Sequence, residues 1–391
     1  MSALFIGLMS GTSLDGVDGV LVDFAVGGGS PLHVLAHRHL EFAADQRAEL
    51  LDLNRSGDDE IHRVALAGNR LAQSYAEVVA SLLHSAGLTS DRVAAVGCHG
   101  QTVRHRPGDF DGVGYTVQVN APALLAERCG IDVIADFRNR DVAAGGQGAP
   151  LVPAFHRALF WRAGAPAAIL NLGGIANLSA IDADGSTVGF DCGPANALLD
   201  AWCAAALGQR FDRDGAWSAS GKVDSALLDA LLAEPYFQVP PPKSTGRDLF
   251  NAQWLEACLA ATGTQTRLPA EDVQATLAEL TARTVADAVR GHASAAKELV
   301  VCGGGAFNHD LMSRLGSRLA PITVVSSADR GLPPEQVEAC AFAWLARAFV
   351  RGEPGNLPAV TGARGPRILG ALYPAEPAPE AEKPPAGGFS R

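Results

Sequence analysis

Phe5-Ile6-Gly7-Leu8-Met9-Ser10-Gly11-Thr12-Ser13-Leu14-Asp15-Gly16-Val17-Asp18 begins as an apolar strand and breaks into a short turn rich in glycine and hydroxyl groups. The chain then resumes as the apolar run Val20-Leu21-Val22. Glycine lets the backbone approach an anion closely, and the N–H groups of Gly11, Thr12 and Ser13 can point into one concavity. The stretch therefore predicts a phosphate-binding turn between two strands.

Two further glycine turns follow strand-like runs later in the chain. One is Ala168-Ile169-Leu170-Asn171-Leu172-Gly173-Gly174-Ile175-Ala176-Asn177-Leu178-Ser179-Ala180-Ile181, which again reads as strand, turn and strand. The other is Leu299-Val300-Val301-Cys302-Gly303-Gly304-Gly305-Ala306-Phe307-Asn308, in which the glycine run leads toward a helix. Three such turns in this order favour a duplicated α/β scaffold that closes on a nucleotide.

Composition restricts the class of protein. The chain has 391 residues, of which 48% are apolar and 19% charged, so it can bury substantial cores and is long enough for two domains. Its net charge of -11 would repel a nucleic-acid backbone. An apolar run of about twenty residues and an N-terminal signal pattern are both missing, and the seven cysteines show no metal-ligand spacing. We therefore expect a cytoplasmic enzyme with reduced thiols that binds neither nucleic acid nor membrane.

The order of the strand-like and helical runs suggests how the chain is divided. Residues 1–140 are expected to form a first lobe and residues 141–350 a second, with residues 351–373 returning to the first lobe. Residues 374–391 are rich in Pro, Ala and Glu and are expected to be a disordered tail. The apolar patterns predict helices within 47–86, 256–263, 272–290 and 337–350, and strands at 92–98, 132–137 and 367–373.

Signatures of other nucleotide-binding and hydrolytic enzymes are missing from the sequence. It contains no GxxxxGK[ST] loop, no GxGxxG after a strand, no HExxH and no GxSxG. The ordered glycine turns instead resemble those of the superfamily of acetate and sugar kinases, heat-shock chaperone ATPases and actin. That resemblance implies an α/β protein with a two-lobed, duplicated, actin-like ATPase (ribonuclease H-like) fold and a cleft between the lobes.

Longer motifs are similar to the anhydro-N-acetylmuramic acid kinase family within that superfamily, over nearly the whole chain to Tyr373. The segments that carry the resemblance are 7–16, 99–102, 135–138, 145–153, 171–177 and 189–194. The departures are Cys192, Ala195 and the tail. The family implies a homodimeric enzyme that uses ATP and Mg²⁺ to open the 1,6-anhydro ring of anhydro-N-acetylmuramic acid and to phosphorylate O6. The product is N-acetylmuramic acid 6-phosphate, formed during recycling of cell-wall peptidoglycan.

Asp191 is the candidate catalytic residue for such a reaction. Attack of water on C1 needs a carboxylate that takes the proton of the water. Asp191 follows the short strand 187–190 and precedes Gly193-Pro194, so we expect its side chain at a sharp turn. If the γ-phosphoryl group captures the leaving O6, one carboxylate suffices and the anomeric centre inverts. An aspartate before Gly-Pro is also a common turn cap, which is the alternative role.

The lactyl group of the sugar ends in a carboxylate, which a guanidinium can bind with two parallel hydrogen bonds. Arg138 is the first candidate for this contact and Arg140 the second. Either arginine could instead pair with Asp136 or Asp141 on the same loop.

Four other residues complete the predicted sugar site. Glu338 lies where the family presents an acid to the sugar, although an acid is also favourable in the first turn of a helix. His99, Gln101 and Thr102 follow a predicted strand and are expected to line the same cleft by hydrogen bonding. A purely structural role is the alternative for His99.

The three glycine turns supply the predicted nucleotide site. The first turn is expected to hold the β- and γ-phosphates, the second the opposite side of the phosphates, and the third the adenosine. The residues are Ser10, Gly11, Thr12, Ser13, Leu14, Asp15, Gly16, Val17, Asn171, Gly173, Gly174, Gly303, Gly304 and Gly305. Asp15 is expected to orient Mg²⁺ through water, or alternatively to form an Asx turn. Asn171 stands where many members of the superfamily carry an acid.

Two other functions remain open at this point. A kinase for a ring-opened amino sugar would use Asp191 to deprotonate a hydroxyl group rather than water. A regulatory ATPase, similar to actin or a heat-shock chaperone, would hydrolyse ATP slowly without a small acceptor.

Overall fold

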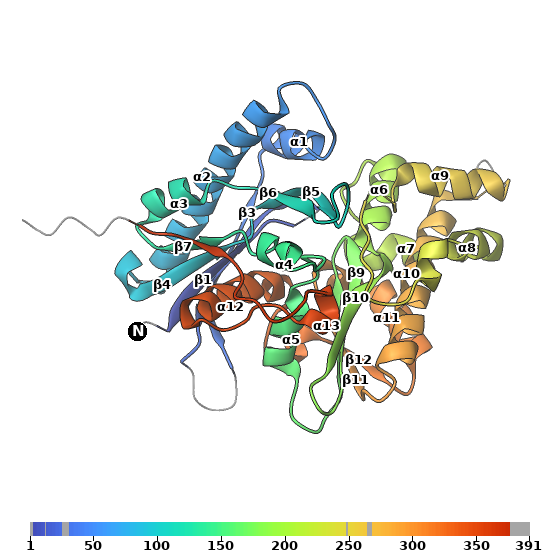
Figure 1. Cartoon of the computed structure of the whole chain (residues 1–391). Coiled ribbons are helices and arrows are strands. Elements are labelled where there is room, and N and C mark those ends of the chain that lie inside the picture. The colour runs from blue at the N-terminus through green and yellow to red at the C-terminus, as the bar shows by residue number, and fades with distance from the viewer. Residues whose placement is uncertain (1–2, 12, 26–30, 248, 264–267, 376–391) are drawn as a thin grey trace, which may run out of the picture.

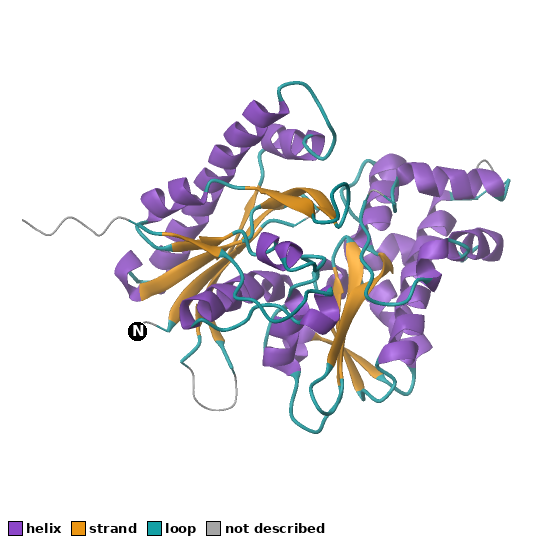
Figure 2. Ribbon diagram, in the orientation of Figure 1, coloured by secondary structure: helices purple, strands orange, loops and turns teal. Residues whose placement is uncertain are grey.

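Two mixed β-sheets form the framework of the molecule, and helices cover their faces (Figures 1 and 2). The computed structural model describes residues 3–11, 13–25, 31–247, 249–263 and 268–375. Thr12 and residues 376–391, which make up most of the predicted tail, lie outside the described residues.

The first sheet has the strand order β13-β7-β4-β1-β2-β3. Strands β1, β2 and β3 are successive antiparallel neighbours, whereas β4 is parallel to β1 and β7 is parallel to β4. The antiparallel strand β13 is added at the edge beside β7. The strands are β1 (Leu4–Met9), β2 (Gly16–Asp23), β3 (His33–Glu41), β4 (Val93–Cys98), β7 (Val133–Ala135) and β13 (Ala371–Tyr373).

The second sheet repeats this arrangement. Its order is β10-β9-β8-β11-β12, with β8, β9 and β10 antiparallel in succession and β11 and β12 parallel to β8. Without β13, the two sheets therefore have the same order and the same strand directions. This repetition confirms the duplicated α/β fold. The strands are β8 (Ala167–Leu172), β9 (Ile175–Ile181), β10 (Thr187–Pro194), β11 (Glu298–Cys302) and β12 (Thr323–Ser326).

Helices connect the strands, and a separate hairpin follows β4. In the part of the chain that the structure describes, no helix is both long and apolar enough to cross a membrane. The hairpin strands are β5 (Gln101–Pro107) and β6 (Gly114–Val119). The helices are α1 (Ala44–Asp52), α2 (Glu60–Ala86), α3 (Pro122–Cys129), α4 (Asn139–Ala143), α5 (Val152–Phe160), α6 (Asn196–Leu207), α7 (Ala216–Ser220), α8 (Ser225–Leu232), α9 (Ala252–Ala261), α10 (Ala270–His292), α11 (His309–Leu319), α12 (Val337–Arg351) and α13 (Pro358–Thr361). The 3-10 helices are η1 (Ser90–Arg92), η2 (Arg213–Gly215), η3 (Pro235–Gln238), η4 (Gly304–Phe307), η5 (Ser327–Arg330) and η6 (Pro334–Gln336).

The strongest periodic patterns in the sequence form the predicted elements. The pattern over 47–86 becomes α1 and α2, and the apolar stripe of α2 packs on β2 and β3. The later patterns become α9, α10 and α12, and the run 92–98 becomes β4. The strands predicted at 132–137 and 367–373 are shorter in the structure. Within these two ranges, only the residues of β7 and β13 pair with a neighbouring strand.

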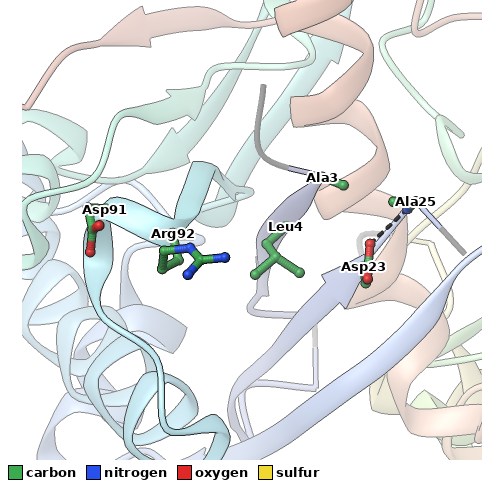
Figure 3. A pocket seen from close by; sticks show the side chains of 6 residues that line it. All are labelled: Ala3, Leu4, Asp23, Ala25, Asp91 and Arg92. Atoms are coloured by element: carbon green, nitrogen blue, oxygen red, sulfur yellow. Dashed lines mark hydrogen bonds between the residues drawn. The ribbon is translucent and has the colours of Figure 1, made fainter.

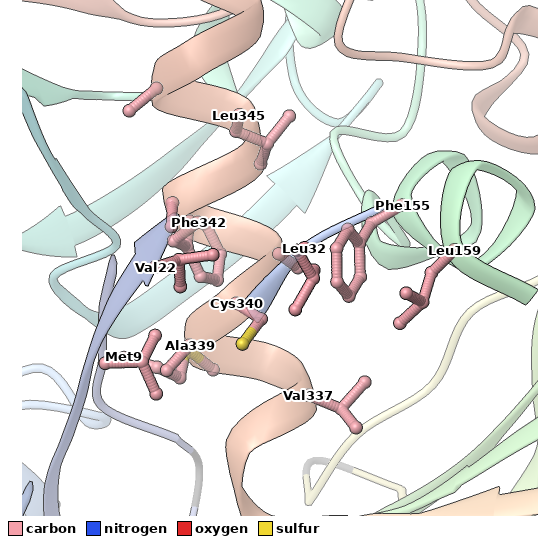
Figure 4. Packing of buried hydrophobic residues seen from close by; sticks show 14 of the residues in the cluster. Met9, Val22, Leu32, Phe155, Leu159, Val337, Ala339, Cys340, Phe342 and Leu345 are labelled. Carbon is pink, nitrogen blue, oxygen red and sulfur yellow. The ribbon is translucent and has the colours of Figure 1, made fainter. Parts of the chain in front are cut away.

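Helices α5 and α12 connect the two halves of the molecule. Helix α5 follows the first sheet in sequence and packs on β8, β9 and β10, whereas α12 follows the second sheet and packs on β1, β2 and β4. The two helices also contact each other. Figure 4 shows α12 between Met9 and Val22 of the first sheet on one side and Phe155 and Leu159 of α5 on the other. The division of the chain at residues 140 and 350 stays a prediction.

Two glycines let α12 lie directly on the first sheet. Gly7 of β1 and Gly97 of β4 are partners in the parallel ladder, so they stand side by side. A Cβ atom on Gly7 would lie 1.9 Å from the carbonyl oxygen of Ala339, and one on Gly97 would lie 2.1 Å from that of Phe342. Both neighbours are backbone atoms of α12, so neither can move away unless the helix moves as well. The close approach of helix and sheet therefore requires glycine at both positions.

We expect Gly97→Ala to destabilise the protein by about 3 kcal/mol, at the upper end of the usual cost of overpacking a core. The substitution Gly316→Ala is the matched control, because Gly316 lies in α11 and a Cβ atom there would meet nothing within 4 Å. That control should be neutral or slightly stabilising, since alanine is the better helix former. Urea unfolding of both variants measures the difference, and equal stabilities would contradict the packing argument.

Candidate active site

Three predicted site residues follow the carboxyl ends of parallel strands. Ser10 comes directly after β1, His99 directly after β4, and Arg138 three residues after the end of β7. Because β1, β4 and β7 are parallel neighbours, these ends meet at one edge of the first sheet. The topology thus brings together residues that are far apart in the sequence.

His99 and Arg138 contact each other at this edge. The Nε and one terminal nitrogen of Arg138 donate to Nε2 of His99, at 3.1 and 2.9 Å. Burial, followed by the charge of Arg138, lowers the pKa of His99 to about 3. His99 is therefore neutral and can accept from the guanidinium without repelling it. Burial also lowers the pKa of Arg138 to about 10, so the arginine remains charged at neutral pH.

The loop after Arg138 is held by a buried carboxylate. Asp141 accepts hydrogen bonds from Asn356 at 2.7 Å, from Thr361 at 2.8 Å and from the backbone N–H of Gly148 at 2.8 Å. The other terminal nitrogen of Arg138 donates to the carbonyl oxygen of Gly148 at 2.8 Å. Arg138 is thus oriented by His99 and this loop.

Among the contacts of the described residues, neither arginine pairs with Asp136 or Asp141 on the same loop. The hydrogen-bond partners of Asp141 are those just described, and Asp136 accepts from Asn139 at 2.7 Å. Arg140 is exposed on the short helix α4. The buried surroundings of Arg138 therefore distinguish it from Arg140.

Asp191 lies within a strand, not at the sharp turn that the sequence suggested. Strand β10 continues to Pro194, and its register with β9 shifts between Asp191 and Gly193, where φ is +150° at the glycine. This irregularity is a β-bulge, which redirects the side chains next to it. The expectation of a turn after Phe190 was wrong because Gly193 and Pro194 still pair with Ala176 and Ile175.

Both carboxylate oxygens of Asp191 accept hydrogen bonds. Asn177 donates through Nδ2 to Oδ1 at 2.9 Å, and the backbone N–H of Thr245 donates to Oδ2 at 2.9 Å. Burial raises the pKa of Asp191 to about 6, and these two donors, then Arg138 and Lys243, oppose that rise. The result is a carboxylate that is ionised at neutral pH and basic enough to accept a proton.

Glu338 occupies the first turn of α12, near Arg138. Burial raises the pKa of its carboxyl group, the charge of Asp18 raises it further, and Arg138 and the Asn171 side chain lower it. The charge of Arg138 therefore acts on both Glu338 and Asp191. Two acids, one from α12 and one from the second sheet, converge on an arginine of the first sheet.

Gln101 and Thr102 lie on β5 rather than on a loop. Gln101 is buried; it accepts from the Ser10 hydroxyl and donates to the carbonyl oxygen of Gly11 at 3.2 Å. Thr102 accepts from Gln118 of β6 at 3.2 Å. Gln101 thus ties the hairpin to the first glycine turn, whereas the Thr102 hydroxyl faces its own hairpin.

The glycine turns differ in how much free space they leave next to their backbone. A Cβ atom on Gly11, Gly173 or Gly304 would meet no heavy atom closer than 3.7 Å, so a ligand can approach these backbones. Gly303 has φ +80°, and a Cβ there would lie 2.3 Å from Oδ1 of Asn171, a buried acceptor without a partner among the described residues. These are the features of a cradle for a polar ligand.

Other members of the predicted nucleotide set have packing roles. Leu14 and Val17 are buried in the core under α2, so only their backbone can face a ligand. A Cβ on Gly16 would lie 2.2 Å from the carbonyl oxygen of Leu40, and one on Gly305 would lie 2.6 Å from the Leu172 side chain. Glycine at 16 and 305 thus allows close packing.

Asp15 is paired across the two halves of the molecule. Arg210, which follows α6, donates to Asp15 at 2.9 Å and lies 3.5 Å from Glu41. Arg210 and Asp15 are each 47% exposed. Nearby Asp200 has its pKa raised to about 7 by burial and then by the charge of Asp15.

A pocket of about 420 Å³ lies elsewhere in the fold (Figure 3). Leu4 lines it at the start of β1, whereas the first glycine turn follows the other end of that strand. The two ends are about 20 Å apart, given the rise per residue of a strand. This pocket is therefore separate from the residues gathered around Asp191.

The sequence did not single out the residues that hold Asp191. Asn177, Tyr236, Lys243 and Thr245 each bond to its side chain or backbone. One signal was available, because a hairpin centred on Gly174 places Asn177, three residues after that glycine, opposite Asn171, three residues before it. No local signal predicts that the segment around Thr245 returns to β10.

The chain was compared with known protein families, curated proteins and solved structures. Residues 3–375 match the family model described as anhydro-N-acetylmuramic acid kinase. A protein of that name from Variovorax paradoxus is 61% identical over 95% of this chain and 99% of its own length. Another, from Cupriavidus metallidurans, is 57% identical over 95% and 98%.

Among solved structures, the chain is similar to an activator of 2-hydroxyisocaproyl-CoA dehydratase from Clostridium difficile with bound ADPNP. The TM-score is 0.48 at 13% identity, covering 89% of this chain and 96% of that one. The family model and the high identity to curated relatives extend over nearly the whole sequence. The chain therefore belongs to the anhydro-N-acetylmuramic acid kinase family.

Proposed function

We propose that this protein is an ATP-dependent kinase that hydrolytically opens the 1,6-anhydro ring of 1,6-anhydro-N-acetylmuramic acid and phosphorylates O6. The products are N-acetylmuramic acid 6-phosphate and ADP, and the reaction serves recycling of cell-wall peptidoglycan. Family membership supports the overall reaction. The observation that carries the chemistry is the partly buried carboxylate of Asp191, whose two oxygens are held by donors and whose pKa is raised to about 6.

Asp191 is the general base in this proposal. It takes a proton from water as the water oxygen bonds to C1, the C1–O6 bond breaks, and O6 bonds to the γ-phosphorus while ADP leaves. The oxygen added at C1 therefore comes from water, and the bridging oxygen stays on C6. Because the water approaches opposite the leaving oxygen, the anomeric centre inverts.

Arg138 is proposed to bind the lactyl carboxylate. Among the contacts of the described residues, three of the five N–H groups of its guanidinium are used by His99 and Gly148. One donor remains on each terminal nitrogen, which matches the two oxygens of a carboxylate. Glu338 would accept from sugar hydroxyl groups on the other side, with His99, Gln101 and Thr102 nearby and Arg140 as the second candidate for the carboxylate.

The glycine turns fit the polyphosphate of ATP. Backbone at Gly11 and Gly173 is open to an anion, and the turns come from equivalent hairpins of the two sheets. Ser10, Ser13, Asp15 and the remaining turn residues, including Gly174 and the undescribed Thr12, complete the proposed phosphate site. Gly303 and Gly304 are proposed to contact the adenosine.

Mg²⁺ would neutralise charge on the β- and γ-phosphates. The described residues contain no group of three or more His, Cys, Asp or Glu side chains placed to hold a metal. This fits an ion that keeps phosphate oxygens and water as most of its ligands. Asp15 can then orient the ion through a bound water, which does not require its ion pair with Arg210 to break.

Two further properties belong to the proposal. We place the enzyme in the cytoplasm, where ATP is supplied and where its seven free cysteines would stay reduced. We also infer a homodimer by similarity to the family, and sedimentation of the purified protein measures this.

The experiment that tests the function is turnover in ¹⁸O-labelled water. Incubation with ATP, Mg²⁺ and 1,6-anhydro-N-acetylmuramic acid should give a phosphosugar with one ¹⁸O at C1 by mass spectrometry. An unlabelled phosphosugar would rule out attack of water on C1. Product formed only from the ring-opened sugar would instead identify an ordinary amino-sugar kinase.

Asp191→Asn should lower kcat by about 10³-fold, since a positioned base contributes about 10² to 10⁴. In the native protein the base must be ionised, so kcat/KM should fall as the pH drops through about 6. Steady-state assays over a range from about pH 5 to about pH 8, which brackets that pKa, record both effects. Near-normal turnover by the folded Asn variant would remove Asp191 from the mechanism.

Arg138→Lys keeps a positive charge but loses the planar fork. We expect kcat/KM for the muramic sugar to fall by about 10²-fold, the lower range for losing a buried charge contact. The corresponding anhydro-N-acetylglucosamine lacks the lactyl carboxylate and should be affected much less. The same assay on Arg140→Ala separates the two arginines, and a larger loss of discrimination there would reverse their roles.

A further inference from the structure

A row of polar side chains crosses the second sheet at the active site. Asn171 of β8 pairs with Asn177 of β9, and Asn177 pairs with Asp191 of β10. Directly opposed residues of antiparallel strands project to the same face of a sheet. The three side chains therefore stand side by side, with Asn177 between Asn171 and Asp191.

Asn177 is well placed to act on Asp191. It is only 8% exposed, and its Nδ2 donates to Oδ1 of Asp191 at 2.9 Å. The backbone N–H of Thr245 donates to Oδ2 at the same distance. An amide nitrogen can only donate, so both contacts favour the carboxylate over the carboxylic acid. They also fix the plane of the carboxylate, because one donor holds each oxygen.

The second donor is anchored independently of β9. The segment that carries Thr245 bonds to β10 through the carbonyl oxygen of Lys243, which accepts from the N–H of Asp191 at 3.3 Å. Tyr236 donates its hydroxyl to the carbonyl oxygen of Asp191 at 2.9 Å. The Lys243 ammonium lies 4.7 Å from the Tyr236 ring centre and donates to the Tyr236 carbonyl oxygen at 3.2 Å. Removal of the Asn177 side chain should therefore leave the Thr245 contact in place.

Among the described residues, four titratable groups act on Asp191 or feel its charge, and Glu338 of α12 acts on the same Arg138. The positive charges of Arg138 and Lys243 favour its ionised form. Tyr236 and Cys192 have pKa values raised by burial and then by the charge of Asp191 itself, so both stay neutral at physiological pH. Arg138, with a pKa of about 10, does not change charge near pH 6, where Asp191 titrates. Burial lowers the pKa of Lys243, and nearby Cys192 and Asp191 oppose that change.

We propose that Asn177 is a positioning residue of the reaction, which aims the carboxylate of Asp191 at the attacking water and keeps it in the proton-accepting form. The proposal rests on the proposed function, because it takes Asp191 as the general base. Asn177 itself touches the base and not the reacting atoms.

The test measures kcat/KM for the sugar against pH at saturating Mg²⁺-ATP. In Asn177→Leu, which keeps the branched shape of the side chain and removes the donor, the acid limb should move up by about one pH unit, the size expected for one hydrogen bond to a charged group. Asn177→Ala should shift it in the same direction and serves if the leucine variant does not fold. An acid limb at the wild-type pH in a folded variant would overturn the proposal.

Ser179→Ala is the matched control. Ser179 lies two residues further along β9, is fully buried and bonds to His156 at 2.9 Å, with no bond to Asp191. It should lose stability as Asn177→Ala does but keep the acid limb in place. An equal shift in both variants would mean that the effect is general loosening of the sheet, which would also overturn the proposal.

Asp191→Asn distinguishes the base role of Asp191 from the positioning role of Asn177. If that variant retains turnover, Asp191 is not the base and both the proposed role and this inference fail. If it is inactive while the limb of Asn177→Leu is unmoved, only the role of Asn177 fails. Inactivity of Asp191→Asn together with the upward shift supports both.

Discussion

The contact of α12 with the paired glycines of β1 and β4 is the constraint on which the site depends. With no side chain at Gly7 or Gly97, the helix backbone lies directly on the sheet. That position places Glu338 in its first turn near Arg138 and sets Phe342 against His99, with ring centres 4.7 Å apart. The same helix packs on α5, so one close approach fixes both an acid of the site and the relation between the two sheets.

Burial of several charges together gives the site its chemistry. Removal from water would neutralise Asp191 and Glu338 and would disfavour the charge on Arg138. For Asp191 the hydrogen bonds from Asn177 and Thr245 oppose this first, followed by the charges of Arg138 and Lys243. For Glu338 the charge of Arg138 and the Asn171 side chain oppose it, while the neutral His99 accepts the hydrogen bonds of Arg138. Asp191 therefore remains ionised at neutral pH with a pKa of about 6, higher than that of an ordinary aspartate. Asp191 is a stronger base than an ordinary aspartate because its neighbours offset only part of the effect of burial on its pKa.

The proposed nucleotide side of the site depends less on burial. The open glycines leave backbone accessible, and the Asp15–Arg210 pair that joins the two halves is about half exposed. An exposed ion pair contributes about 0 to 1 kcal/mol, so this pair links the two halves only weakly. The proposed sugar side is thus held by buried hydrogen bonds, whereas the proposed phosphate side has open backbone and an exposed ion pair.

Local patterns in the sequence were sufficient for the elements and for the order of the glycine turns. The alternation of strand, turn and strand at 5–22 and 168–181 predicted two equivalent hairpins, and the sheets have that repeated order. The apolar period over 337–350 likewise predicted α12. These features depend on residues close together in the sequence, so the spacing of apolar residues and glycines reveals them directly.

By itself, the sequence determined the duplicated α/β fold, the family and the identity of the acids and arginines worth testing. Only the tertiary structure decided that Asp191 lies in a bulged strand, that Arg138 bonds to His99 while Arg140 is exposed, and that glycine at 16 serves packing. It alone also revealed Asn177 and Thr245 as the partners of Asp191. The reason is physical: these contacts join segments 14 to 54 residues apart, and no local periodicity records which distant groups meet once the strands pair.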